Sequence, residues 1–331
     1  MPTRLPRRPA LVCALLALAA LALPAAVHAQ AFPSKPIRLV IPFPPGGSTD
    51  IVGRILAKRM GEEYGQQVIV ENRAGAGGGL GTVQVVRAEP DGHTLVMVPA
   101  GPITVIPHVN KDIGYRMSDL VPVAMVFRSP FLLVVSQQSP HKALGELLER
   151  GKPGQGAPAA YGSSGVGALS HLGSEMLNAA AGTAFLHVPS KGTPGTLQAL
   201  MAGDIQWALV TGNDGKGPVE GGKLRALAVM SQKRSALFPQ VPAMGELGLK
   251  NLDMEVWFGL FAPARIPPAT LEQLNRTVRR ILAEPEFGTR MREFGGEVPL
   301  EPNTPVAVQA YLDRESAAFG AVVRQVGIKG E

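Results

Sequence analysis

The sequence predicts an α/β protein of two domains, each a mostly parallel sheet flanked by helices. Apolar runs of four to eight residues alternate with stretches of helical periodicity almost from end to end, which is typical of βαβ units in a doubly wound sheet. The chain has 331 residues, of which 45% are hydrophobic and 18% charged. At roughly 150 residues per domain, this length favours two domains, each able to bury its own core.

The pattern of apolar residues predicts the individual strands and helices, given below in chain order. The strands are the short apolar runs, which lie at 37–42, 67–71, 94–98, 123–128, 131–136, 159–161, 184–188, 205–210, 224–230 and 255–262. Two of the helices show an apolar face, formed by Ile51, Ile55, Leu56 and Met60 and later by Leu271, Leu274, Val278 and Ile281. A final long helix follows the proline-rich segment 299–305 and is marked by Val308, Leu312, Phe319, Val323 and Val326.

Two segments are predicted to cross between the domains. Arg-Ser-Pro interrupts an apolar run at 125–130, and the strand at 224–231 follows the glycine-rich segment 212–222. The first domain would then consist of 30–127 and 227–331, with the C-terminal helices, and the second of 128–226. A cleft would lie at this two-strand hinge, and we expect a ligand to close the domains about strands near 127–131 and 224–230.

Residues 1–29 are predicted to be a secretory signal peptide. Arg4, Arg7 and Arg8 precede an apolar run at 10–23, and Val27-His28-Ala29 forms a small-residue cleavage pattern, with cleavage expected after Ala29. The run is shorter than the roughly 20 residues that span a bilayer, so a retained anchor is the lesser alternative. The single cysteine lies in this run. The exported chain therefore has no disulfide, thiolate metal site or cysteine nucleophile.

Charge and histidine spacing exclude several classes of function. The formal net charge is +6, and three of the arginines lie in the predicted signal peptide, so no nucleic-acid partner is expected. His93, His108, His141, His171 and His187 show no paired spacing for a metal. The glycine-rich segment 72–81 has a leucine where a dinucleotide fingerprint requires its third glycine. We therefore expect no metal and no cofactor.

The loop 42–50, Pro-Phe-Pro-Pro-Gly-Gly-Ser-Thr-Asp, joins the first strand to the first helix. Gly46 and Gly47 let the backbone approach a ligand, Ser48 or Thr49 can cap the helix, and the N–H groups at its start favour an anion such as a carboxylate. The alternative is a capped turn in which Asp50 complements the helix dipole.

A second loop, at 161–171, repeats this arrangement with Ser163, Ser164 and Gly165. If the two loops face each other across a cleft, they form a clamp for an anion. The alternative is a hydrolase that uses Ser164 and His171. However, Val166 stands where a nucleophile elbow requires its last glycine.

Two further strand ends carry polar residues. Gly192 and Thr193 follow Lys191, which either pairs with an anionic ligand or is a solvated surface charge, and Thr211 ends the strand after Trp207. All four loops fall at carboxyl ends of strands, where ligands bind in open α/β sheets.

These segments together resemble the periplasmic substrate-binding receptors of the tripartite tricarboxylate transporter type, also called Bug receptors. The resemblance covers nearly the whole chain after residue 31, through the segments 32–37, 40–50, 70–78, 90–95, 162–165, 170–172, 222–229 and 257–264. It implies a two-domain periplasmic binding protein that captures a small carboxylate without catalysis. It also implies location in the periplasm and delivery to membrane transporter subunits, or alternatively a signal to a membrane sensor. We expect a monomer.

The resemblance also implies which residues bind the ligand. They are Gly46, Gly47, Ser48, Thr49, Ala100, Gly101, Ser163, Ser164, Gly165, Ser170, Gly192 and Thr193, to which Thr211 is added at its strand end. The chain departs from the family pattern where Ser190 replaces an aromatic residue, where Thr211-Gly212 replace an aspartate and where His93 replaces a tyrosine. The lost ring and carboxylate leave room for a bulkier or more anionic ligand.

Overall fold

The computed structural model describes residues 32–156, 158–299 and 302–326. The chain divides into residues 1–34 and one compact unit, Lys35–Glu331, and the fold described below is that of the second unit. The predicted signal peptide lies outside the described residues.

Nine strands within the described residues form one mixed sheet. They are β1 Ile37–Ile41, β2 Val68–Asn72, β3 Thr94–Pro99, β4 Leu120–Ser136, β5 Ala160–Ser163, β6 Leu186–Pro189, β7 Trp207–Thr211, β8 Leu224–Val229 and β9 Glu255–Pro263. The order is β2-β1-β3-β9-β4-β7-β5-β6, and β8 pairs with β4. Because β1 to β3 and β5 to β7 are parallel while β4 and β9 run antiparallel to their neighbours, the parallel part is limited to three strands at each end.

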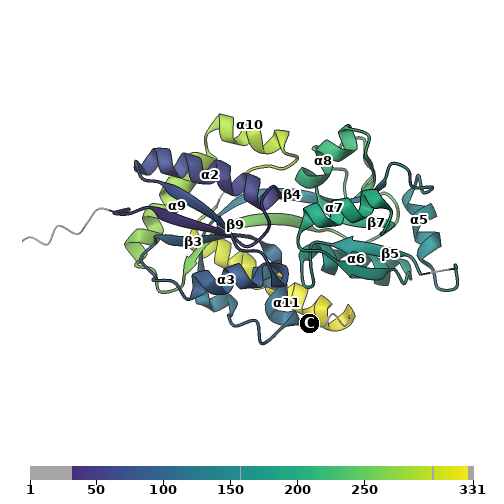
Figure 1. Ribbon diagram of the computed structural model, residues 1–331, viewed down its shortest axis with the longest axis horizontal. Coiled ribbons are helices and arrows are strands. Elements are labelled where there is room, and N and C mark those ends of the chain that lie inside the picture. Colours follow the sequence, from purple (N-terminus) through teal and green to yellow (C-terminus); the bar gives the residue numbers. More distant parts are fainter. Residues whose placement is uncertain (1–31, 157, 300–301, 327–331) are drawn as a thin grey trace, which may run out of the picture. The chain divides into compact units, whose positions relative to one another are not determined.

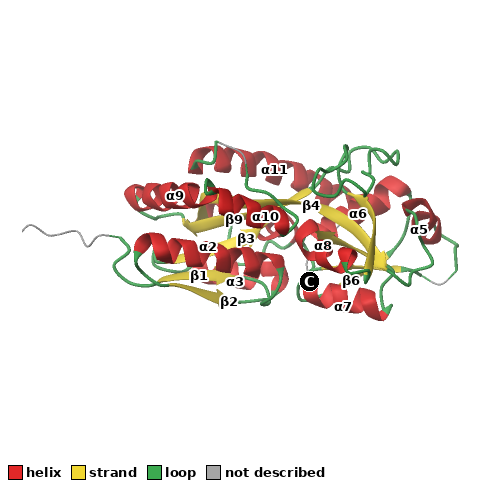
Figure 2. Cartoon of the chain, turned by 90° about the horizontal axis from the view of Figure 1, so that it is seen from above, coloured by secondary structure: helices red, strands yellow, loops and turns green. Residues whose placement is uncertain are grey.

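Helices flank both ends of this sheet, which confirms the predicted α/β class (Figures 1 and 2). They are α2 Ser48–Tyr64, α3 Gly79–Val86, α4 Ile106–Val109, α5 Leu144–Gly151, α6 Leu169–Ala181, α7 Thr193–Ala202, α8 Gly212–Glu220, α9 Pro268–Leu282, α10 Pro285–Glu293 and α11 Pro305–Val326. Short 3₁₀ helices lie at η1 Ala76–Gly78 and η3 Met117–Asp119, and a short π-helix lies at η2 Gly101–Val105.

The long strand β4 joins the two ends of the sheet. Its first part, to Pro130, pairs with β9, and its second part, from Phe131, pairs with β7 and β8. We call residues 35–130 and 255–326 the first lobe and residues 131–254 the second lobe. The sequence predicted two strands in this segment, 123–128 and 131–136, because Arg-Ser-Pro interrupts the apolar run. In the structure this proline lies where the pairing partner changes, a position that a strand tolerates.

The chain returns to the first lobe later than the sequence suggested. β8 was expected to cross between domains, but it stays paired with the second part of β4, from Leu132 to Ser136. Met254 N–H then donates to Met230 O at 3.0 Å, and β9 begins at Glu255. The second crossing is therefore the start of β9, and the segment between β8 and β9 packs with the second lobe, where Val229 bridges Ala243.

The apolar face predicted for α2 is buried in part: Leu56 and Met60 are buried, Ile51 and Ile55 are only half-buried, and Val52 joins the buried face instead. Val52, Leu56 and Met60 of α2 are fully covered by the sheet, and burial of each such side chain contributes about 1.5–3 kcal/mol. At the middle of the molecule the rings of Phe127 and Phe258 stack at 5.0 Å, so β4 and β9 are fixed to each other beside the lobe junction.

Two asparagines complete the hydrogen bonding where β4 and β9 shift register. The shifts lie between Pro122 and Ala124 and between Met125 and Phe127. Asn275 Nδ2 donates to Val123 O at 2.7 Å. Asn303 accepts from Met125 N at 2.8 Å and donates to Met125 O at 2.7 Å.

We expect Asn303→Ala to lower the free energy of unfolding by about 2 kcal/mol, because it leaves a buried N–H and a buried carbonyl without their partner. Urea denaturation measures this loss. Gln309→Ala is the matched control, since its amide donates to Asp313 on the exposed face of α11. A loss no larger than that of the control would contradict the prediction.

Candidate functional site

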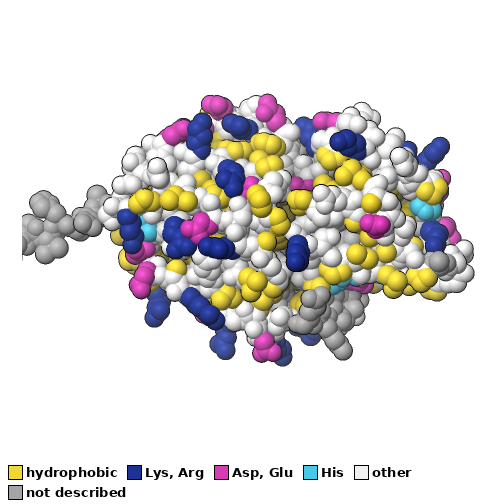
Figure 3. Space-filling view, in the orientation of Figure 1, with side chains coloured by type: hydrophobic (Ala, Val, Ile, Leu, Met, Phe, Trp, Pro, Cys, Tyr) yellow, Lys and Arg dark blue, Asp and Glu magenta, His cyan; other side chains and the backbone are white. Residues whose placement is uncertain are grey.

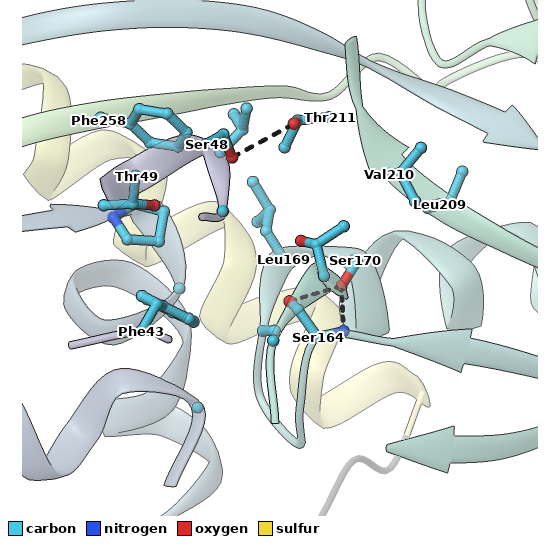
Figure 4. Close-up of a pocket in the computed structure, with 18 of the residues that line it drawn as sticks. Phe43, Ser48, Thr49, Ser164, Leu169, Ser170, Leu209, Val210, Thr211 and Phe258 are labelled. Carbon is cyan, nitrogen blue, oxygen red and sulfur yellow. Dashed lines mark hydrogen bonds between the residues drawn. The ribbon is translucent and has the colours of Figure 1, made fainter. Parts of the chain in front are cut away.

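A cavity lies between the two lobes and takes its walls from both. Its volume is about 620 Å³ including the opening to solvent. The first lobe contributes the β1–α2 loop, the end of β3 with η2, and β9. The second lobe contributes the β5–α6 loop, the start of α7 and the end of β7. The lining residues shown in Figure 4 include Phe43, Ser48, Thr49, Ser164, Leu169, Ser170, Leu209, Val210, Thr211 and Phe258.

The wall that the described residues give this cavity is largely apolar, carries several hydroxyl groups and has no charge. Among the described residues that line it, none carries a charged side chain. The polar groups are the hydroxyls of Ser48, Thr49, Ser164, Ser170, Thr193 and Thr211. The remaining surface is largely apolar, from Phe43, Phe131, Leu169, Leu209, Val210, Val256 and Phe258. An anion here would be held by hydroxyls and backbone N–H groups, with its hydrocarbon part against the apolar wall.

Asp50 shapes the β1–α2 loop from behind. Its carboxylate accepts from Gly46 N at 3.0 Å, from Arg54 Nε at 3.0 Å and from Asn72 Nδ2 at 2.8 Å. Asn72 Nδ2 also donates to Phe43 O at 3.0 Å. Although burial acts most strongly to raise the pKa of Asp50, these hydrogen bonds outweigh it and lower that pKa. Asp50 therefore holds the loop in shape rather than only complementing the dipole.

The predicted capping of α2 by Ser48 or Thr49 is wrong. Gly47 occupies the N-cap position and supplies no side-chain cap. Ser48 instead donates to Asp214 of the second lobe, from its backbone N to Oδ1 and from its Oγ to Oδ2, both at 3.1 Å. The carboxylate of Asp214, 166 positions later in the chain, thus accepts the hydrogen bond from the Ser48 N–H at the start of α2.

Asp214 belongs to the first turn of α8. Its N–H donates to Thr211 Oγ1 at 3.2 Å, so Thr211 is the N-cap of this helix. Burial raises the pKa of Asp214, while hydrogen bonds with Thr193, Thr211 and Ser48 act to lower it.

In the second lobe, Ser164 and Ser170 form a hydroxyl pair at the start of α6. Ser164 N donates to Ser170 Oγ at 3.1 Å, and the two Oγ atoms are 3.1 Å apart (Figure 4). The neighbouring Ser163 is fully buried and bonds His187 Nε2 at 2.6 Å. Two adjacent serines therefore face different surroundings, one the cavity and the other the interior of the lobe.

His171 does not pair with Ser164. Its Nδ1 accepts from Gly167 N at 3.2 Å, and its ring stacks on His187 with centroids 3.7 Å apart. Burial, together with the nearby His187, lowers the pKa of His171 to about 3, and burial lowers the pKa of His187 to about 4. Both rings are neutral at neutral pH and pack within the second lobe.

The histidine stack predicts acid sensitivity. In the unfolded chain both histidines would titrate near 6.5, so between pH 6.5 and about 4 the unfolded state binds more protons than the folded state. The stability due to the stack is thus complete above pH 6.5 and is lost as the pH falls. We expect the unfolding temperature to decrease steadily over this range and to decrease less in His187→Gln. His141→Gln, outside the stack, should keep the wild-type pH dependence, and an identical profile in all three proteins would contradict the assignment.

The structure brings most of the predicted binding residues together. The cavity is lined by Gly47, Ser48, Thr49, Gly101, Ser164, Ser170, Gly192, Thr193 and Thr211. Four others do not line it. Gly46 bonds Asp50 behind the loop, Ala100 is buried with its carbonyl bonded to Thr104, and Ser163 is turned to His187. Gly165, with Lys191, lines a second cavity, which shares Phe43 and Ser164 with the first.

Sequence reasoning missed the apolar wall and Asp214. Phe43 lies within the 42–50 motif, in which only the glycines and hydroxyls indicated ligand binding. Phe258 and Val256 belong to β9, whose run of apolar residues indicates burial without indicating a cavity. For Asp214, the available signal was its position three residues after Thr211, as expected for the first turn of a capped helix.

On the face shown in Figure 3, basic side chains lie among acidic ones. In the described part of the chain, no group of three His, Cys, Asp or Glu side chains is placed to hold a metal ion. No helix among those residues has the length and apolar character needed to cross a membrane.

Residues 52–328 match the family model of the tripartite tricarboxylate transporter family receptor. The chain belongs to this family. Among solved structures, this tripartite tricarboxylate transporter receptor is similar to the periplasmic binding protein BugD, with 32% identity, a TM-score of 0.85 and coverage of 91% of this chain and 100% of the other.

Two similar structures, both from Rhodopseudomonas palustris, contain ligands. Rpa4515 with adipate has 29% identity and a TM-score of 0.85, covering 90% of this receptor and 99% of that chain. MatC with bound malate has 30% identity and a TM-score of 0.82, covering 88% of this receptor and 100% of that chain. The predicted periplasmic-binding-protein fold is thereby confirmed, and the family role is that of a solute-binding receptor.

Proposed function

We propose that this receptor captures a small carboxylate-bearing metabolite in the cavity between its lobes and delivers it to a membrane transporter. One observation carries the proposal: hydroxyls from both lobes meet in a cavity without charged side chains, against an apolar wall. Such a lining suits a small organic acid. The carboxylates adipate and malate in the two similar structures support this ligand class, and the family's transporter role favours transport over signalling to a sensor.

The carboxylate is assigned to the Ser164 and Ser170 end of the cavity. Both hydroxyls lie at the start of α6, where the helix dipole favours an anion. Ser170 Oγ already accepts the Ser164 N–H. A bound carboxylate would select the arrangement in which Ser170 donates to Ser164 and Ser164 donates to the ligand, a charge-assisted hydrogen bond.

The proposed protein is a monomer in the periplasm that binds its ligand without catalysing a reaction. Signal-peptide cleavage after Ala29, location in the periplasm and a monomeric state belong to this proposal, as does the absence of catalysis. The His171 geometry supports binding rather than hydrolysis, since its Nδ1 is engaged by Gly167. The lobes would rotate about β4 near Pro130 and the start of β9, where the chain crosses between them.

A thermal-shift screen tests the proposal. The panel contains short monocarboxylates, dicarboxylates, hydroxy acids and oxo acids, with uncharged diols and diamides of the same skeleton as controls. An acid at 100 times its dissociation constant stabilises the fold by about 2.7 kcal/mol, which raises the melting temperature by several degrees. Stabilisation by acids but not by their uncharged counterparts is expected. No shift with any acid, together with turnover of an ester, would contradict it.

A further inference from the structure

Asp214 places a carboxylate directly behind three of the hydroxyls that line the cavity. Ser48, Thr193 and Thr211 all belong to the lining, and all three form hydrogen bonds with Asp214. The contact joins the lobes, because Ser48 begins α2 and Asp214 lies in α8. Figure 4 shows Ser48 and Thr211 together, at a place separate from the Ser164 and Ser170 pair.

The direction of these hydrogen bonds determines what the cavity offers to a ligand. A hydroxyl has one hydrogen and two lone pairs. Ser48 gives its hydrogen to Asp214 Oδ2. Thr211 accepts the Asp214 N–H, and its own single hydrogen is shared between two acceptors on this side, Ser48 Oγ at 3.5 Å and the Asp214 carboxylate. With these hydrogens committed, the hydroxyls present their lone pairs to the cavity.

The same contact argues against a second carboxylate at this end. The start of α2 was expected to hold the anion, but Ser48 N–H already donates to Asp214 Oδ1 at 3.1 Å. A ligand carboxylate beside Ser48 would meet acceptor lone pairs backed by a carboxylate. The two ends of the cavity therefore have opposite hydrogen-bonding roles. The Ser164 end can donate a hydrogen bond to a ligand, whereas the Ser48 end accepts one.

We propose that Asp214 is a specificity-determining residue, which makes the Ser48 and Thr211 end of the cavity a hydrogen-bond acceptor and so selects carboxylates that also carry a hydroxyl or ammonium donor. This inference rests on the proposed function, since it presupposes that an acid binds. It extends that function by naming the second group of the ligand. An oxo acid of the same skeleton offers only lone pairs and is discriminated against.

The test is Asp214→Asn, which keeps the shape of the side chain. The oxygen of the introduced amide still accepts the Ser48 N–H, while its nitrogen donates to Ser48 Oγ, so the hydroxyl hydrogen of Ser48 turns toward the cavity. Calorimetric titrations use matched pairs of acids: lactate with pyruvate, 2-hydroxyglutarate with 2-oxoglutarate, and 3-hydroxybutyrate with acetoacetate. The quantity measured is the ratio of the oxo-acid to the hydroxy-acid dissociation constant in the pair that binds best.

We expect this ratio to be at least ten in the wild type and to fall at least tenfold in Asp214→Asn. Asp204→Asn, an exposed acid of the same lobe, should leave it unchanged. If Asp214→Asn does not fold, Ser48→Ala replaces it, and loss of the acceptor should likewise abolish the preference for the hydroxy acid.

The outcomes separate this inference from the proposed function. If acids bind but the wild type does not distinguish hydroxy from oxo acids, or if the ratio is the same in the variant, the role of Asp214 is overturned while carboxylate capture stands. If no acid of any kind binds, the proposed function fails and the inference fails with it.

Discussion

Gly101→Leu is expected to lower ligand affinity more than a hundredfold while leaving the protein folded. Gly101 lines the cavity at the start of η2 in the first lobe. A Cβ at this position would lie 3.4 Å from Ala168 Cα, Gly167 O and Leu169 N, all of the second lobe. The added side chain would enter the cavity and hold the lobes apart.

The expected size follows from the contacts that depend on a closed cleft. If the lobes cannot approach, a ligand whose carboxylate is held at Ser164 in the second lobe loses its hydrogen bond to Ser48 and its burial against Phe43 and Phe258 of the first lobe. Loss of that hydrogen bond costs about 1 kcal/mol, and exposure of roughly 80 Å² of apolar surface costs about 2 kcal/mol at roughly 25 cal/mol per Å², which together amount to about 3 kcal/mol or more. This corresponds to more than about a hundredfold at 1.4 kcal/mol per decade.

Calorimetry and small-angle scattering together measure the effect. The variant should bind no acid at concentrations that saturate the wild type, and its radius of gyration should exceed that of the ligand-bound wild type. Gly145→Leu is the control, because a Cβ there on α5 has no atom within 4 Å. Binding within tenfold of the wild type would show that the backbone approach at Gly101 is not needed for capture.

The parts of the site that the sequence predicted are those with a local signal. A glycine and hydroxyl loop between a strand and a helix is visible in ten residues, and both the 42–50 and the 161–171 loops do reach the cavity. The side on which each residue lies was harder to predict. Ser163 and Ser164 are adjacent and chemically identical, and only the packing of His187 against Ser163 distinguishes them.

The features that could not be predicted depend on contacts between distant segments. Asp214 meets Ser48 only because β4 brings the two lobes together, and nothing near either residue indicates the other. The continuity of β4 through Pro130 depends likewise on β9, β7 and β8 arriving on the correct sides. Periodicity identified the strands, whereas the partners of each strand decided where the chain crosses between lobes.

Ser164→Ala is expected to weaken carboxylate binding by about tenfold to a hundredfold with little change in stability. Ser164 is half-buried at the cavity wall, and the hydrogen bond it would give to a carboxylate contributes roughly 1.5–3 kcal/mol, at 1.4 kcal/mol per decade of affinity. Its backbone N–H would still donate to Ser170 Oγ, so the loop should keep its shape.

The neighbouring serine supplies the matched control. Ser163→Ala removes a hydroxyl that bonds His187 and Gly165 inside the lobe, so it should lower the melting temperature and leave the affinity within a few-fold of the wild type. Titration and melting curves for both variants therefore separate binding from folding. If Ser164→Ala binds within twofold of the wild type and is fully folded, its hydroxyl is not the anion donor. The backbone N–H groups at the start of α6, or water held there, would then bind the carboxylate.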